Sequence, residues 1–225
     1  MGLLRDEIAL DLFHGVDPFL GFSPSSELID QQGWASSHPY LAEAIRQVPD
    51  RSVVVEIGVW KGGSVITMGK ELKRLGRDQA IIAVDTWLGS HEHWVDPELF
   101  RSLRTHMGRP SLQSTFMANI ANNRLEDWVV PLPLDSVNAS RVVAEMEAKI
   151  SLLHVDAGHD YVSVSADLAA WYPLLQPGGV LLCDDYYDGG VWPEVRRAVD
   201  AFVSNNGLSI RQYGDGKCWI EKPIH

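Results

Sequence analysis

The sequence predicts an α/β protein, a single doubly wound sheet of seven strands that ends in an antiparallel hairpin. Short β-branched runs alternate with helical patterns from residue 51 onward, which is typical of a parallel sheet covered by helices on both faces. The last two strand patterns are separated only by Gly214-Asp215-Gly216, a turn too short for a helical crossover, so they must pair as a hairpin. The first strand pattern runs into glycines at 58, 62 and 63, as in sheets that bind a ligand at this edge.

Each element follows from its local pattern. Runs rich in Val, Ile and Leu predict strands near 52–57, 80–85, 128–133, 151–155, 178–183, 208–213 and 217–221. Helical periodicity predicts helices near 64–75, 111–123, 137–149, 160–172 and 192–205. The first 50 residues contain Pro18, Pro24, Pro39 and Pro49 and are typical of short helices and loops rather than of a second core. We therefore expect an N-terminal helical segment over 1–50, acting as a lid or a subunit contact, in front of one main domain over 51–225.

Composition narrows the possible partners. A chain of 225 residues with 45% hydrophobic and 22% charged residues is long enough for one sizeable core. Its net charge of -11 would repel nucleic acids and anionic membrane surfaces, so neither is an expected partner. A basic leader and an apolar run of roughly 20 residues are both missing, which predicts a cytoplasmic protein. The two cysteines, Cys183 and Cys218, lie in apolar strand patterns and are expected to be buried free thiols.

The segment after the first strand predicts a cofactor site. The carboxyl end of this strand is where a doubly wound sheet changes strand order, and ligands bind there. Glycines let the backbone approach a ligand closely, and the N-terminus of the following helix presents free N–H groups. The spacing is not that of a pyrophosphate loop, and the acid before the first glycine favours a cationic ligand over a nicotinamide dinucleotide. The candidate cofactor contacts here are Glu56, Gly58, Lys61, Gly62, Gly63 and Ser64. Alternatively, the glycines only form a turn and Glu56 is a hydrogen-bonded buried carboxylate.

The next two strand ends supply further candidates. Asp85 is placed to contact both ribose hydroxyls of a nucleoside cofactor, or else to cap its own loop, and Thr86 follows it. Trp87 could stack on an adenine or pack under the loop. Asp135 and Ser136 could hold the adenine edge, and Asp135 could equally be the N-cap of the following helix.

Three aspartates predict a metal site. Asp156 ends one buried strand, and Asp184 and Asp185 end the next. If these strands are neighbours, the three carboxylates converge and repel one another unless a cation binds between them. Hard oxygen ligands without cysteine favour Mg²⁺, with Mn²⁺ or Ca²⁺ as alternatives. Alternatively, Asp184 only initiates a loop and the nearby His159 is a surface histidine at a strand end.

Histidines near the aspartates suggest acid–base chemistry. His159 follows Asp156 by three residues, and its imidazole titrates in the range of a useful general base. Asp160 is the reserve candidate for the base, although it could simply be a helix N-cap. His154 alternates with core residues inside its strand, which predicts a buried, hydrogen-bonded histidine. The segment His91-Glu92-His93 has no matched third ligand nearby and is expected to belong to a substrate-facing loop.

These motifs resemble a known enzyme family. The resemblance covers roughly residues 50–205 and rests on the first-strand segment, Val84-Asp85-Thr86-Trp87, Asp156-Ala157-Gly158-His159-Asp160-Tyr161, Asp167, Trp171, Leu174-Leu175-Gln176-Pro177-Gly178-Gly179 and Asp184-Asp185-Tyr186. They are similar to those of the metal-dependent O-methyltransferases of the macrocin O-methyltransferase type. The resemblance implies a Rossmann-like class I methyltransferase domain and S-adenosylmethionine as donor. It also implies Mg²⁺ at the positions matching Asp156, Asp184 and Asp185, and His159 as base. Asp156 is counted among the expected cofactor contacts as well.

The resulting hypothesis is methyl transfer to a hydroxyl of a small molecule, often a sugar on a natural product. The cation would lower the pKa of the acceptor hydroxyl, His159 would take the proton, and the oxygen would attack the sulfonium methyl group. Tyr186, Tyr187 and Trp192 could line the acceptor pocket or belong to the core. The alternatives are a nicotinamide-dependent oxidoreductase and a non-catalytic relative that keeps the cofactor fold. A homo-oligomer is possible.

Overall fold

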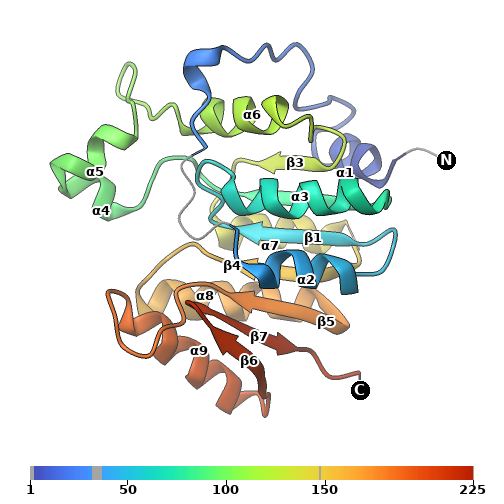
Figure 1. Cartoon of the computed structure of the whole chain (residues 1–225), viewed down its shortest axis with the longest axis vertical. Helices are drawn as coiled ribbons and strands as arrows, with labels where there is room; N and C mark the ends of the chain where they lie inside the picture. The colour runs from blue at the N-terminus through green and yellow to red at the C-terminus, as the bar shows by residue number, and fades with distance from the viewer. Residues whose placement is uncertain (1–2, 32–36, 147, 225) are drawn as a thin grey trace.

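The computed structural model is a three-layer α/β sandwich built on one central sheet (Figure 1). It describes residues 3–31, 37–146 and 148–224. The predicted strand pattern is confirmed, and the strands are β1 (Val53–Ile57), β2 (Ala80–Val84), β3 (Val129–Leu132), β4 (Ile150–Val155), β5 (Leu175–Cys183), β6 (Ile210–Gly214) and β7 (Lys217–Glu221).

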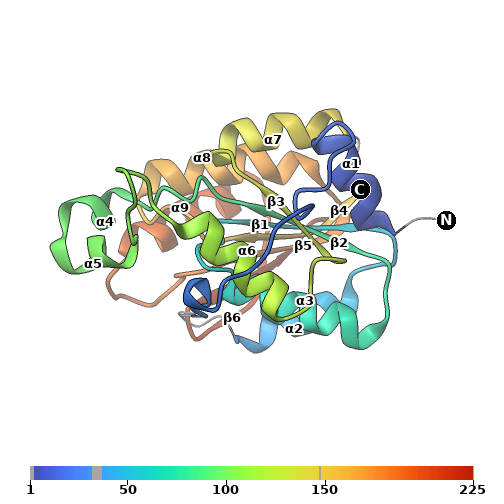
Figure 2. The same ribbon diagram turned by 90° about the horizontal axis from the view of Figure 1, so that it is seen from above.

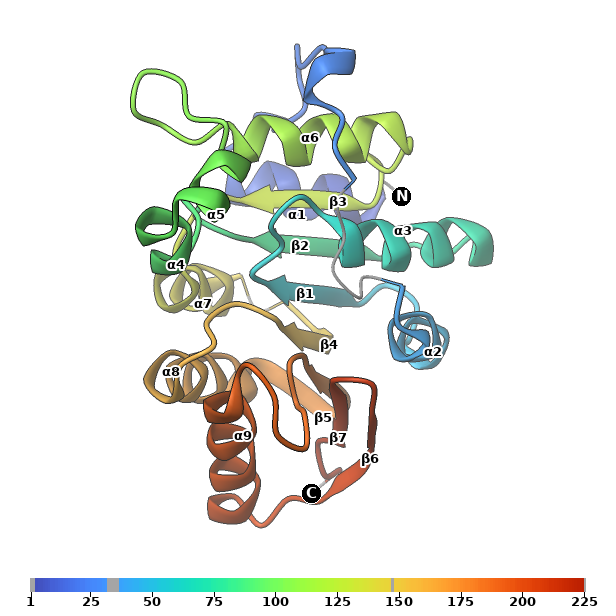
Figure 3. The same ribbon diagram turned by 60° about the vertical axis from the view of Figure 1, so that its left-hand side comes forward.

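The strand order of this seven-stranded sheet is β3-β2-β1-β4-β5-β7-β6, which the edge-on view in Figure 3 follows from top to bottom. β1 to β5 pair in parallel, and β7 is antiparallel to both β5 and β6. The predicted hairpin is therefore confirmed. Its second strand lies inside the sheet between β5 and β6, a placement that the turn alone does not dictate. The chain order reverses between β1 and β4, so the edge where a ligand is expected lies above these two strands.

Helices cover both faces of the sheet, as Figure 2 shows from above. One face carries α1 (Leu4–Leu12), α7 (Ser136–Glu145), α8 (Tyr161–Trp171) and α9 (Pro193–Asn205). The other carries α2 (Pro39–Gln47), α3 (Gly63–Leu75) and α6 (Leu112–Asn122). The short helices α4 (His91–Val95) and α5 (Pro97–Ser102) project beyond the carboxyl ends of the strands.

The alternation of side chains along each strand divides the core into two layers. In β1, Val53, Val55 and Ile57 face α1, α7, α8 and α9, while Val54 packs toward α2, α3 and α6. Both layers are dry and rich in branched residues. Trp171 fills the first layer and Trp219 the second, and both are fully buried. Cys183 and Cys218 are buried free thiols, as predicted.

The element boundaries differ from the sequence expectation at a few ends. β5 starts at Leu175 rather than near 178, because Leu175 already pairs with Ile150 of β4, ahead of an irregularity in which Gly178 has a φ of 76°. The helix expected to reach residue 149 ends at Glu145. In the first 50 residues α1 adds Ile8 and Ala9 to one core layer, and α2 adds Leu41 and Ile45 to the other. The segment 1–50 was expected to act as a lid or a subunit contact. It includes residues 32–36, which lie outside the described residues. None of the described helices is long and apolar enough to cross a membrane.

Candidate functional site

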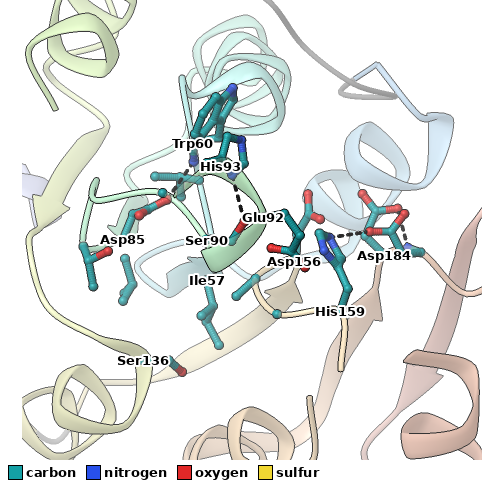
Figure 4. A pocket seen from close by; sticks show the side chains of 18 of the residues that line it. Ile57, Trp60, Asp85, Ser90, Glu92, His93, Ser136, Asp156, His159 and Asp184 are labelled. Carbon is teal, nitrogen blue, oxygen red and sulfur yellow. Dashed lines mark hydrogen bonds and ion pairs between the residues drawn. The ribbon is translucent and has the colours of Figure 1, made fainter. Parts of the chain in front are cut away.

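A cavity of about 630 Å³ opens at the carboxyl ends of β1, β2, β4 and β5. Figure 4 shows side chains from all four strand ends and from α4 pointing into it. It is the place that the strand order predicts for a ligand.

The loop after β1 forms one wall of the cavity. Gly58 has a φ of 80°, and a Cβ atom there would overlap the backbone of Asp156 and Ala157. Glycine therefore allows the loops after β1 and β4 to touch. Gly63 and Ser64 continue the wall, where the first turn of α3 presents its free N–H groups to the cavity.

Four of the predicted contacts from the β1 and β2 loops do not line the cavity. Glu56 is fully buried behind its wall, where its carboxylate accepts a hydrogen bond from Ser64. Lys61 is buried and forms an ion pair with Asp30 at 2.7 Å. Gly62 faces Phe116 and forms the N-cap of α3 with a φ of 86°. The expectation of direct ligand contact is corrected for these residues, because packing and ion pairing turn them away.

Trp87 is the fourth predicted contact that does not line the cavity. Its side chain is 2% exposed, its ring centroid lies 5.0 Å from that of Phe116, and its Nε1 donates to the Trp60 carbonyl at 2.9 Å. Of the two expected roles, Trp87 therefore packs under the loop, and in this conformation its ring does not face the cavity to stack on an adenine.

Asp85 organises the loops after β1 and β2 at one end of the cavity. Its carboxylate accepts hydrogen bonds from the backbone N–H of Trp60 at 2.8 Å and of Trp87 at 2.7 Å. Burial raises the pKa of Asp85, although the amide hydrogen bonds oppose this effect. Asp85 and Thr86 both line the cavity, and each carboxylate oxygen keeps a second lone pair for a ligand hydroxyl.

Asp135 and Ser136 line the cavity opposite Asp85. Asp135 is the N-cap of α7 and accepts from the Asn138 backbone N–H at 3.0 Å, so the predicted cap is confirmed and the residue still faces the cavity. The Ser136 hydroxyl accepts a hydrogen bond from Trp171 Nε1 at 2.9 Å. Behind it, burial raises the pKa of Asp167 to about 6.

The acidic cluster of Asp156, Asp184 and Asp185 lies at the other end of the same cavity. Burial, followed by the charge of Asp184, raises the pKa of Asp156 well above its usual range. Burial also disfavours the charged form of Asp184, but Lys217 outweighs it, so the pKa of Asp184 is lowered. All three acids lie at this end of the cavity, so the prediction that they converge is confirmed for their positions. Their carboxylates do not form one compact group, because Asp184 turns to Lys217 and Asp185 to His159.

A row of buried polar side chains runs beneath the cavity, formed by Glu56, His154, Lys217 and Asp184. His154 is fully buried, as predicted, with Nδ1 3.5 Å from Glu56 and Nε2 3.2 Å from Lys217 Nζ. Lys217 is also fully buried and donates to Asp184. An ammonium group can only donate, so His154 Nε2 accepts and its proton sits on Nδ1.

Sequence reasoning missed Lys217. The usable signal was its position two residues before Trp219 in a strand, which puts both on the same buried face.

Glu56, His154 and Asp156 have ligand atoms within 4.8 Å of one another, the one compact metal-like group among the described residues. A proton on His154 Nδ1 and the adjacent ammonium of Lys217 disfavour a cation at this position. The acidic cluster, with oxygen ligands facing the cavity, is the better candidate.

His159 lies beside the acidic cluster. Its Nε2 is 3.1 Å from a carboxylate oxygen of Asp185, and its ring stacks on Trp192 with centroids 4.2 Å apart. Its Nδ1 is buried and has no hydrogen-bond partner within the described part of the chain. Asp160, by contrast, is an exposed N-cap of α8 that does not line the cavity. Hydrogen bonding led by Ser163 lowers the pKa of Asp160, so the reserve role as base is corrected.

The helix α4 closes the cavity from above. Ser90, Glu92 and His93 line it, whereas His91 is exposed and does not. The stretch expected to be a loop is thus a short helix. The His93 ring lies 4.5 Å from that of Trp60, and burial lowers the pKa of His93. Of the other aromatic candidates, Tyr187 and Trp192 line the cavity, while Tyr186 is a core residue bonded to Asp200.

Comparison with known proteins identifies the family. A family model described as a methyltransferase domain matches residues 55–186, more than half of the chain. Mycinamicin III 3''-O-methyltransferase of Micromonospora griseorubida is 28% identical over 163 residues, covering 69% of this chain and 62% of that protein. The chain thus spans less than two thirds of this relative's length.

Two solved structures are similar in fold. The O-methyltransferase NovP has a TM-score of 0.62 at 21% identity, covering 82% of this chain and 78% of that one. CalS11, a TDP-rhamnose 3'-O-methyltransferase of calicheamicin biosynthesis, has a TM-score of 0.55 at 19% identity, covering 81% of this chain and 75% of that one. The chain therefore belongs to the methyltransferase domain family and has the Rossmann-like fold of the class I, S-adenosylmethionine-dependent methyltransferases.

Proposed function

We propose that the protein is an S-adenosylmethionine-dependent O-methyltransferase that uses a divalent cation, most suitably Mg²⁺, to methylate a hydroxyl of a small molecule. The observation that carries this proposal is that one continuous cavity joins two half-sites. The loop after β1, with Asp85 and Asp135, offers a nucleoside-binding half. The acidic cluster and His159 offer a half suited to activating a hydroxyl.

The residues present fit S-adenosylmethionine. The cavity volume falls in the range of sites for ligands of this size. Asp85 and Asp135 lie at positions suited to ribose and adenine, and the first turn of α3 can hold a carboxylate. The negative charge of Glu56 behind the wall favours a cationic centre above Gly58. When bound, this cofactor supplies an electrophilic methyl group on a positively charged sulfur.

The acidic cluster fits a divalent cation by charge and by donor type. Within the described residues Lys217 is the one ammonium group beside its three carboxylates, and burial together with the charge of Asp184 raises the pKa of Asp156. The Asp156 carboxylate has no hydrogen-bond partner among the described residues, so its oxygens are available as ligands. Such a cation would supply Lewis acidity toward the oxygens of an acceptor.

The chain's own residues define the proton transfer. Asp185 orients the His159 imidazole through Nε2, which places the lone pair on Nδ1. Stacking on Trp192 restricts the ring further. The His159 imidazole, which lines the cavity, would accept the proton of the acceptor hydroxyl as the oxygen attacks the methyl group.

The charges of the side chains that line the cavity also limit which acceptors can bind. Among the described residues, six carboxylates line the cavity, and no Lys or Arg, the residues that bind phosphate groups, is found there. This argues against a nucleotide-activated sugar of the kind named for CalS11 and favours a neutral or amine-bearing acceptor, such as a finished glycoside of the mycinamicin type. The oxidoreductase alternative is not favoured, because the loop after β1 lacks a pyrophosphate-binding pattern.

The test combines binding with turnover. Calorimetry should show S-adenosylhomocysteine binding to the purified protein, and methyl transfer from labelled S-adenosylmethionine to a panel of neutral, amine-bearing and nucleotide-linked glycosides should need Mg²⁺. Turnover that persists after chelation would remove the cation from the proposal. A protein that binds S-adenosylhomocysteine but methylates none of these hydroxyl acceptors would favour the non-catalytic alternative.

A further inference from the structure

The buried lysine of β7 is not explained by the fold alone. Lys217 is 0% exposed and is among the largest fully buried side chains of the protein. Burying an ammonium group is costly unless a partner compensates its charge. Here the compensation comes from Asp184, a residue of the acidic cluster.

The sheet itself places this pair. Cys183 of β5 pairs with Cys218 of β7 in antiparallel register, so Asp184 and Lys217 are the next cross-strand neighbours toward the cavity. From there the Lys217 ammonium contacts Asp184 on one side and His154 Nε2, at 3.2 Å, on the other. His154 Nδ1 lies in turn 3.5 Å from Glu56, without a hydrogen bond to it. The ammonium is therefore contacted from two directions.

The electrostatics of the acidic cluster depend on this ammonium. Its Nζ contacts the Asp184 carboxylate and both side chains are buried, so it places a positive charge directly beside the three carboxylates. A divalent cation bound by Asp156 and Asp184 would occupy the same negative field and would be repelled by Lys217. The lysine and the cation are thus competing counter-charges.

We propose that Lys217 is a positioning residue for the acidic cluster: it holds the Asp184 carboxylate in place when no cation is bound, and it weakens the binding of the cation. The part concerning the cation rests on the proposed function. The physical consequence is a site that stays folded without metal and binds metal reversibly.

The experiment replaces Lys217 by methionine, which keeps most of the stem and removes the charge. We expect Lys217→Met to lower the dissociation constant for Mn²⁺, measured by calorimetry and electron paramagnetic resonance at neutral pH, at least about tenfold. Lys217→Arg keeps the charge and should bind Mn²⁺ within about threefold of wild type. Without Mn²⁺ the methionine variant should unfold at lower urea concentration than wild type, and saturating Mn²⁺ should close most of this gap.

Lys222→Met is the matched control. Lys222 lies just after the same strand, and its Nζ donates to the carbonyls of Tyr172 at 2.9 Å and of Leu175 at 2.5 Å. Its loss should reduce stability equally with and without Mn²⁺ and leave the Mn²⁺ affinity unchanged. That pattern separates a structural lysine from one that competes with a cation.

The outcomes distinguish this inference from the proposed function. If wild type binds Mn²⁺ and Lys217→Met binds it no more tightly, the inference is overturned while the proposed function stands. If wild type fails to bind Mn²⁺ but the methionine variant binds it, the inference is supported and the cation requirement falls. If Lys217→Met does not fold, refolding with Mn²⁺ decides: recovery only in its presence supports the inference, and failure under both conditions overturns it.

Discussion

The Nε2 atom of His159 lies 3.1 Å from a carboxylate oxygen of Asp185, and both residues line the candidate site. This contact orients the imidazole. Asp185 itself adopts a φ of 55°, a backbone conformation that aspartate tolerates better than most residues. The geometry of the proposed base is thus set by the residue that also belongs to the acidic cluster.

Replacing His159 by glutamine should therefore lower kcat by roughly a hundredfold to ten-thousandfold, the usual contribution of a general base. The affinity for S-adenosylhomocysteine should stay within about threefold of wild type, because His159 lies at the acceptor end. Asp160→Asn is the neighbouring control, and it should keep near-normal turnover because Asp160 only caps α8. Undiminished turnover in the glutamine variant would eliminate His159 as the base.

Asp156→Asn should separate stability from activity. The pKa of Asp156 is raised in the folded protein, so its ionised form at neutral pH reduces the free energy of unfolding, and the neutral amide should increase it. Mg²⁺-dependent turnover should fall more than about a hundredfold, because a ligand of the Lewis acid is lost. Urea unfolding and initial rates measure the two effects. A variant that is both less stable and fully active would contradict the assignment.

Asp85→Ala should weaken the binding of S-adenosylhomocysteine at least about tenfold, since one hydrogen bond to a charged group contributes about 1.5–3 kcal/mol. The loop will loosen as well, because Asp85 accepts from Trp60 and Trp87. Asp96→Ala is a suitable control, as Asp96 caps α5 without lining the cavity. Calorimetry with 2'-deoxy and unmodified nucleosides would show whether the loss concerns the ribose. Equal losses for both nucleosides would argue for loop support alone.

The raised pKa of Asp167 predicts that the free energy of unfolding depends on pH. Burial raises the pKa of Asp167 to about 6 in the folded protein, above the ordinary value of an aspartate, so the folded state binds the proton more tightly. The stability associated with the protonated form is complete below about pH 4 and is lost as the pH rises through about 6. Asp167→Asn should therefore raise the free energy of unfolding by up to about 3 kcal/mol at pH 8 and by little at pH 4. Chemical unfolding at both values checks this. An equal effect at the two pH values would show that Asp167 is not protonated in the fold.

The sequence was sufficient for the sheet and for most of the site, because both depend on local patterns. Strand ends carry Asp85, Asp156 and Asp184 to one edge, and alternation alone places His154 in the core. It was insufficient where a side chain had two possible directions. Trp87 and Lys61 lie in the same loops as residues that line the cavity. Trp87 turns away from the cavity because it packs against Phe116, and Lys61 because it pairs with Asp30.

Lys217 was missed for a different reason. A lysine directly after a Gly-Asp-Gly turn normally belongs to a solvated hairpin end, and its partner lies 33 residues away in sequence. Nothing in the hairpin pattern states that β7 enters the sheet between β5 and β6. Once that placement is known, the register with β5 makes the contact with Asp184 unavoidable.

The inner position of β7 also has a consequence for how the molecule is assembled. β1 to β5 by themselves carry Asp156, Asp184 and Asp185 to one edge of the sheet. Without β7 this cluster would lack its ammonium partner, and its mutual repulsion would work against closing the sheet edge. The strand that extends the sheet beyond β5 therefore also supplies the counter-charge of the site.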